Sequence, residues 1–140
     1  MLTEKDYCDY DTCVALKKLG YKEKTLAYYT SEGIFHWRRA YIYDVSIPDL
    51  AKSSNKKLYK HVLDAVSLYE AQKWLREEKN LYVEVTIILS GKNYMFEIYD
   101  TETAILKRFI HEDYVTYEEA LLEGIKEAIK ILKEESNGKK

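Results

Sequence analysis

The chain has 140 residues, and 22 Lys and Arg against 24 Asp and Glu give it a formal net charge of −2. This length is enough for one core that folds without disulfide or metal cross-links, and the near balance of charge excludes a general nucleic-acid coating protein. Tyrosine stands out in the composition, with 14 residues against three Phe and two Trp.

A short helix and a hairpin are the first predicted elements. Apolar residues recur on one face of residues 11–20, and Asp9 or Asp11 precedes them as a candidate N-cap. Two aromatic-rich runs follow within residues 25–38. Because Gly33 between these runs can supply the positive φ of a tight turn, the pattern predicts a β-hairpin.

The least regular part of the sequence covers residues 40–66. Its first residues look extended, but Pro48 and a run of Lys, Ser and Asn then interrupt the pattern. We expect a variable connection here, with a short helix at residues 57–63 inside it. The connection also contains the one basic patch of the chain, formed by Lys52, Lys56, Lys57 and Lys60.

A second helix and a three-stranded meander follow. Ser67 and Glu70 have the spacing of a capping box, which predicts a helix over residues 68–79. From Leu81 the apolar period changes to two, so one face of the sheet should be buried and the other should face water or a partner. The antiparallel strands are expected at residues 81–89, 94–99 and 104–110. The apolar side of the first strand should hold Val83, Val85, Ile87 and Leu89.

A long C-terminal helix is the last predicted element. Thr116 and Glu119 repeat the capping-box spacing ahead of an amphipathic segment at residues 117–135, and residues 136–140 should form a disordered tail. The elements together predict an α+β fold: helix, β-hairpin, helix, three-stranded antiparallel meander and long C-terminal helix. The helices should pack on one face of a mostly antiparallel sheet, in a single domain over residues 1–135.

The sequence has neither the pattern of an export signal nor that of a membrane span. Acidic residues stand at the N-terminus where a signal peptide needs a basic start, and the longest apolar stretch is far below the roughly 20 residues that cross a bilayer. We therefore expect a cytoplasmic protein without membrane contact. In that reducing compartment Cys8 and Cys13 should be free thiols, and a local disulfide between them is the alternative.

Three segments of the chain resemble a group of known sequences. They are Leu68-Tyr-Glu-Ala-Gln-Lys-Trp-Leu-Arg-Glu-Glu-Lys79, Tyr117-Glu-Glu-Ala120, and Leu19-Gly20-Tyr21 with the Tyr-rich hairpin after it. In these segments, and over most of its length, the chain resembles small uncharacterised proteins of gut Bacteroides genomes and of their phages and mobile elements. The resemblance implies a bacterial or mobile-element origin and an accessory role, and it implies no particular activity.

No motif of a known catalytic, metal or nucleotide site occurs in the sequence. The three histidines lack metal-ligand spacing, and the glycine-containing turns match neither the P-loop nor the dinucleotide-binding fingerprint. We expect no enzyme activity, no cofactor and no metal. Glu84 and Glu97, each in the middle of a predicted strand, allow two interpretations: a carboxylate pair on neighbouring strands, or solvent-facing residues on the open side of the sheet.

An aromatic and basic run is the candidate interaction surface. It consists of Trp37, Arg38, Arg39, Tyr41 and Tyr43. Rings beside guanidinium groups suit stacking on bases or contact with a protein surface. The alternative is that this run forms the edge of the hairpin, with Trp37 in the core.

Two classes of function fit these features. The first is a non-catalytic protein-interaction module, whose partner is another protein or a second copy in a homodimer, because tyrosine offers large amphipathic contacts and is enriched at interfaces. The second is a single-stranded nucleic-acid-binding accessory protein that uses tyrosine stacking and the basic patch, although the net negative charge counts against it. An enzyme without a recognisable motif is a further alternative. Under each of them, part of the sheet should present tyrosine rings outward.

Overall fold

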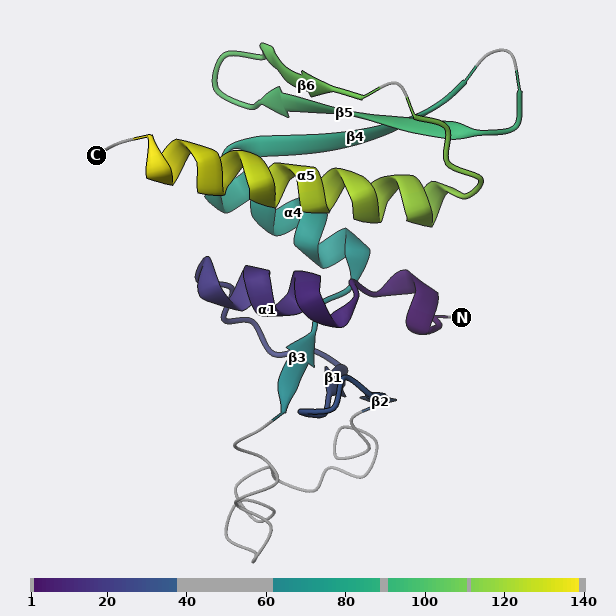
Figure 1. Cartoon of the computed structure of the whole chain (residues 1–140), viewed down its shortest axis with the longest axis vertical. Helices are drawn as coiled ribbons and strands as arrows, with labels where there is room; N and C mark the ends of the chain where they lie inside the picture. Colours follow the sequence, from purple (N-terminus) through teal and green to yellow (C-terminus); the bar gives the residue numbers. More distant parts are fainter. Residues whose placement is uncertain (1, 38–61, 89–90, 111, 139–140) are drawn as a thin grey trace, which may run out of the picture. The chain divides into compact units, whose positions relative to one another are not determined.

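The computed structural model describes residues 2–37, 62–88, 91–110 and 112–138. They belong to two compact units: residues 7–66 form the hairpin unit, and residues 1–6 with 67–140 form the meander unit. The described elements include three α-helices and two three-stranded antiparallel sheets (Figure 1), which confirms the α+β fold. The single domain expected over residues 1–135 stays a prediction.

The hairpin unit contains one helix and three short strands. These are α1 (Tyr10–Lys18), β1 (Ala27–Tyr29), β2 (Phe35–Trp37) and β3 (Leu63–Ala65), and the strand order is β2-β1-β3. Asp9 caps α1 by accepting a hydrogen bond from the Thr12 N–H at 3.0 Å, as the sequence predicts. Gly33 has a φ of 81° in the hairpin turn, which is the conformation expected of it.

Strand β3 differs from the prediction. The sequence favours a short helix over residues 57–63, but Leu63 begins a strand that pairs antiparallel with β1, with Leu63 opposite Tyr29. Three residues are too few to show a period, so the pairing with a distant strand decides their conformation. Most of the variable connection, residues 38–61, lies outside the described residues.

Aromatic rings and two buried thiols pack together in the hairpin unit. Five rings pack with centroid distances between 5.1 and 5.8 Å, from Tyr7, Tyr10, Tyr29, Phe35 and Trp37. Cys8 and Cys13 are free and buried, which confirms the free-thiol prediction. The Tyr29 hydroxyl donates to the Cys8 carbonyl at 2.7 Å, and the Cys8 N–H donates to the Val66 carbonyl at 2.8 Å.

The Cys13 thiol should be unreactive in the native protein. Burial raises the pKa of this thiol to about 12, so the nucleophilic thiolate is absent at neutral pH. Iodoacetamide should leave both buried cysteines unmodified in the folded chain and alkylate both in concentrated guanidinium chloride, as measured by intact mass. A Glu32→Cys variant, exposed in the hairpin turn, provides the control and should be alkylated once when folded. Equal rates of modification in the folded and unfolded chain would contradict the buried placement.

The meander unit contains the elements with the clearest sequence signals. They are a short 3-10 helix (Glu4–Asp6), α4 (Leu68–Glu78), β4 (Leu81–Ile87), β5 (Tyr94–Asp100), β6 (Leu106–Phe109) and α5 (Tyr117–Asn137). The Ser67 and Thr116 hydroxyls cap α4 and α5, each accepting a hydrogen bond from an N–H of the first turn at 3.1 Å. α5 extends two residues beyond its predicted end at Glu135, into the segment expected to be a disordered tail.

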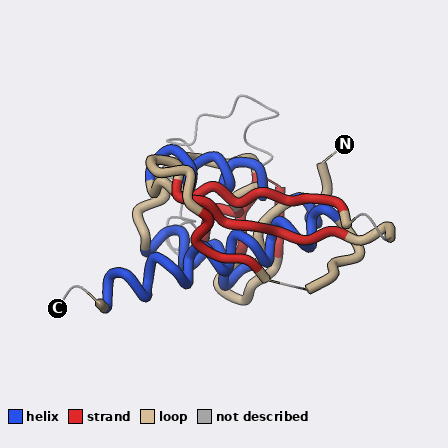
Figure 2. The backbone as a smooth tube through the Cα atoms, turned by 90° about the horizontal axis from the view of Figure 1, so that it is seen from above, coloured by secondary structure: helices blue, strands red, loops and turns tan. Residues whose placement is uncertain are grey.

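The three strands of this unit form an antiparallel sheet in the order β4-β5-β6. α4 and α5 lie on one face of this sheet, as Figure 1 shows. In Figure 2, which is seen from above, the strands lie in front of α5. The covered face carries Val83, Phe96 and Ile98, all at most 1% exposed. The predicted packing of helices on one face of an antiparallel sheet is therefore confirmed in the meander unit.

One residue of the predicted apolar face is not covered. Ile87 is 60% exposed, although it continues the alternation of Val83 and Val85. It pairs with Tyr94, whose ring packs against Tyr117 in the first turn of α5 at a centroid distance of 6.0 Å. Ile87 therefore lies where the helical cover ends. Leu89, the next residue of the alternation, lies outside the described residues.

Specific contacts attach the helices to the sheet. Gly124 of α5 lies so close to the sheet that a Cβ there would be 3.2 Å from the Phe96 ring and would overlap a methyl group of Val83. Gln72 of α4 is buried, and its side-chain N–H donates to the Val83 carbonyl of edge strand β4 at 2.7 Å. On β6, Arg108 reaches two carboxylates of α5, Glu127 and Glu134.

Candidate functional site

The sheet of the meander unit has a second face that no described element of this unit covers. Residues paired across antiparallel strands project to the same side, so the pairing assigns eight side chains to this face. We call it the open face, and it consists of Tyr82, Glu84, Thr86, Met95, Glu97, Tyr99, Leu106 and Phe109. Leu106 and Phe109 are 46% and 37% exposed, and the other six are half-buried among their neighbours.

The open face is arranged in rows across the strands. Tyr82 lies opposite Tyr99, and the row continues to Leu106 on β6. The next row brings Glu84 opposite Glu97 and continues to Phe109. Two carboxylates thus lie at the centre of a surface whose margins are aromatic and apolar.

Hydrogen bonding organises one side of the carboxylate pair. The Tyr99 hydroxyl donates a hydrogen bond to Oε2 of Glu97, two residues before it on β5. This bond is the largest cause that raises the pKa of Tyr99 to about 12, followed by desolvation and the negative charges of Glu97 and Glu84. Tyr99 therefore remains a neutral hydrogen-bond donor throughout the physiological pH range.

The carboxylate pair has no counter-ion within the described part of the chain. The ion pairs there involve other acids, and no Lys, Arg or His of the described residues lies within ion-pair distance of Glu84 or Glu97. Like charges directly opposite each other destabilise a sheet. Arg76 of α4 lies at the margin of the open face, and its guanidinium carbon is 5.9 Å from the centroid of the Tyr82 ring.

Both sequence interpretations of Glu84 and Glu97 hold together. The register brings the two residues directly opposite each other, and the alternation places them on the uncovered side of the sheet. The outward tyrosine rings expected from the composition are also confirmed, by Tyr82 and Tyr99. The amino-acid composition does not predict which residues form the open face. These residues come from three strands, and only the strand register brings them together.

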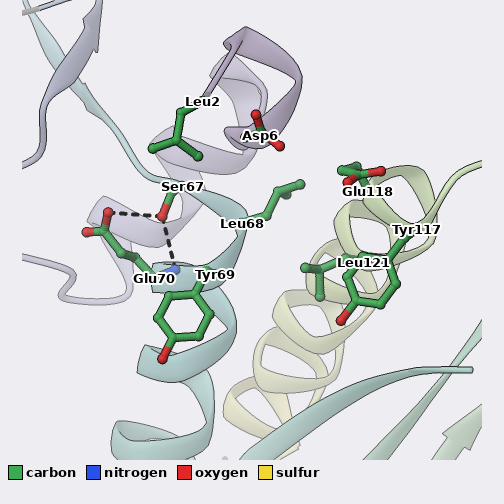
Figure 3. A pocket seen from close by; sticks show the side chains of 9 residues that line it. All are labelled: Leu2, Asp6, Ser67, Leu68, Tyr69, Glu70, Tyr117, Glu118 and Leu121. Carbon is green, nitrogen blue, oxygen red and sulfur yellow. Dashed lines mark hydrogen bonds between the residues drawn. The ribbon is translucent and has the colours of Figure 1, made fainter.

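A groove in the same unit lies at the beginnings of α4 and α5 (Figure 3). It has a volume of about 440 Å³, and its lining includes Leu2, Leu68 and Leu121. The rings of Tyr69 and Tyr117, 66% and 43% exposed, come from the two different helices. The groove is therefore apolar inside, with hydroxyl-bearing rings at its side.

Two of the three carboxylates that line this groove have local structural roles. Asp6 accepts a hydrogen bond from the Thr3 N–H at 2.7 Å. Glu70 accepts one from the Ser67 hydroxyl at 2.9 Å, within the N-terminal cap of α4 (Figure 3). Such caps satisfy backbone donors at the start of a helix. The third carboxylate of the lining, Glu118, accepts no hydrogen bond and forms no ion pair within the described residues, so the groove contains a single uncommitted charge, whereas the open face contains a carboxylate pair.

A smaller hollow in the hairpin unit is lined by Cys13, a candidate nucleophile. Its volume is about 370 Å³, and its lining includes Cys13, Lys17, Lys22 and Asp64. Only 1% of Cys13 is exposed, and its Sγ accepts a hydrogen bond from the Val66 N–H at 3.4 Å. A buried, protonated thiol in this role supports packing, and it gives no basis for nucleophilic catalysis.

The sequence-predicted interaction surface is described only at its first residue. Trp37 lies on edge strand β2, is 43% exposed and packs edge-on against Phe35 at 5.1 Å, so it is not a core residue. The other members lie outside the described residues: Arg38, Arg39, Tyr41 and Tyr43. The same holds for the basic patch, Lys52, Lys56, Lys57 and Lys60.

No family model, curated protein or solved structure matches this chain. Arguments about function therefore rest on the residues themselves. In the described residues, no group of three or more His, Cys, Asp or Glu side chains is arranged to hold a metal ion. None of the described helices combines the length and the apolar composition needed to cross a membrane.

Proposed function

We propose that this chain is a non-catalytic protein-interaction module with an accessory role, and that the open face is its contact surface. The observation that carries the proposal is the chemistry of this uncovered sheet face. Antiparallel sheets can face water on one side, and polar side chains then suffice. Here the face instead carries two Tyr, a Met, a Leu and a Phe, side chains that are typical of interface cores or of buried surfaces.

The rings of the open face are also held in place before any contact forms. Tyr82 and Tyr99 are half-buried against neighbouring strands, and the hydroxyl of Tyr99 is fixed on Glu97. Side chains that are already ordered lose less conformational entropy when a partner binds. This supports the open face as a contact surface more strongly than the exposed tyrosines of the groove.

Site-specific photo-crosslinking tests the proposal. p-Benzoylphenylalanine replaces Phe109 on the open face, or Lys130 on the exposed side of α5 as the matched control. In cells that naturally encode the chain, we expect a discrete crosslinked product from position 109 and none from position 130, with the product identified by mass spectrometry. Equal products from both positions, or none from position 109, would refute the open face as the contact surface.

Single-stranded nucleic-acid binding remains the second candidate function from the sequence. It depends on the basic patch, which lies outside the described residues, whereas the open face carries two carboxylates that would repel phosphates. Retention of a fluorescent single-stranded oligonucleotide at low salt, with loss at higher salt, would favour this alternative. Absence of retention at low salt would exclude it.

A further inference from the structure

We propose that the partner of the open face presents a basic segment, and that a Lys or Arg side chain of this segment binds between Glu84 and Glu97. The inference rests on the proposed function, because it names the chemistry of the partner for the same surface. It is carried by the juxtaposition of two carboxylates that have no counter-ion among the described residues, on a sheet face that no described element of the meander unit covers.

Charge provides the first step. Glu84 and Glu97 face each other directly across β4 and β5, and no cation of the described residues balances them. Their mutual repulsion is unfavourable in the free protein. A cation placed between them replaces this repulsion with two attractions, so the free energy gained on binding exceeds that of a single surface ion pair.

Hydrogen-bonding capacity provides the second step. Oε2 of Glu97 accepts from Tyr99, whereas Oε1 of Glu97 and both carboxylate oxygens of Glu84 accept no hydrogen bond from a described residue. A guanidinium has five N–H donors and an ammonium has three, and neither has an acceptor. The free oxygens therefore match the donors of an Arg or Lys side chain.

The surroundings of the carboxylates provide the third step. The rings of Tyr82 and Tyr99 form the adjacent row, and aromatic rings attract cations through their π-systems. Phe109 and Leu106 on β6 extend the surface with apolar area. This combination suits a peptide in which basic residues alternate with apolar ones, because the apolar residues can cover β6 while the cation reaches the carboxylates.

Two defined peptides test the inference with the full chain. The probe is a fluorescein-labelled Leu-Arg-Leu-Arg-Leu peptide, and its partner has citrulline, a neutral isostere, in place of each Arg. We expect the Arg peptide to bind at least about tenfold more tightly, with affinity that falls as salt is added. Amide shifts in NMR spectra should cluster at residues 82–86 and 95–99. Equal affinity for the two peptides would overturn the inference.

A pair of double variants isolates the two carboxylates. Glu84→Gln with Glu97→Gln removes the central charges, and Glu77→Gln with Glu78→Gln changes the net charge equally on the exposed side of α4. We expect about tenfold weaker binding of the Arg peptide for the first variant and little change for the second. The Glu84→Gln and Glu97→Gln variant should melt at the same temperature as the original chain or at a higher one, because the repulsion between the two carboxylates is removed. Equal weakening in both variants would mean that only net charge matters, and would overturn the inference.

The crosslinking experiment separates this inference from the proposed function. If the Phe109 crosslink persists in the Glu84→Gln and Glu97→Gln variant, the open face is a contact surface, but its partner is not recognised through a cation. If no Phe109 crosslink forms in the original chain, the proposed function itself fails. A crosslinked product with nucleic acid would also overturn a basic protein segment as the occupant.

Discussion

Replacing Gly124 with valine should destabilise the protein by about 2 to 3 kcal/mol. The helix α5 touches the sheet at this residue, where a Cβ would overlap a methyl group of Val83 and lie 3.2 Å from the Phe96 ring. Both neighbours are at most 1% exposed, and a β-branched valine on a strand has little rotamer freedom to move aside. The helix must therefore separate from the sheet or the strand must shift.

Urea unfolding followed by circular dichroism measures this loss. Lys130→Val provides the control, since it introduces the same side chain on the exposed side of the same helix and should cost only about 0.5 kcal/mol through helix propensity. Adding Val83→Ala to the Gly124→Val variant should restore part of the stability, because it removes the methyl group that clashes. A Gly124→Val protein as stable as the control variant would show that α5 does not approach the sheet this closely.

Replacing Gln72 with methionine should cost about 1 to 3 kcal/mol, the second largest effect that we expect. Methionine has a similar length and lacks the N–H that donates to the Val83 carbonyl at 2.7 Å. β4 is an edge strand, and this carbonyl is bonded by a helix side chain. Without the donor, a polar group is left buried and unpaired.

The neighbouring substitution Lys73→Met is the matched control for Gln72→Met. Lys73 is exposed on the same helix, so its replacement changes the helix propensity similarly and leaves the buried carbonyl bonded. Urea unfolding should show the control within about 0.5 kcal/mol of the original chain. The hydrogen bond has no role in stability if the two variants unfold at the same urea concentration.

Most of the meander unit could be predicted because its signals are local. Ser67 and Thr116 are each followed three residues later by Glu, and the period of the apolar residues changes from about 3.6 to two at Leu81. Each of these signals acts within one helical turn or one strand. The helices and strands of this unit consequently appear close to their predicted bounds.

Strand β3 and the open face could not be predicted in the same way. Leu63 joins a sheet only by pairing with Tyr29, which is distant in the sequence. A strand of three residues is too short to show the alternation of apolar residues that would predict it. Glu84 and Glu97 are isolated acids in the sequence, and only the register makes them a pair. The sequence allowed the pairing of Glu84 and Glu97 as one of two interpretations, whereas its candidate interaction surface and basic patch were runs of nearby residues, because a pattern along the chain does not show which residues meet across strands.

The hydrogen bond between the Cys8 N–H and the Val66 carbonyl has a consequence for how this chain can vary. The meander unit is made from residues 1–6 and 67–140, so the hairpin unit is an insertion within it. The second and the last residues of the insertion, Cys8 and Val66, meet at this bond, as is common where one compact unit interrupts another. Lengthening or shortening the chain between them leaves both attachment points in place, so the inserted segment can diverge while the sheet register downstream stays the same.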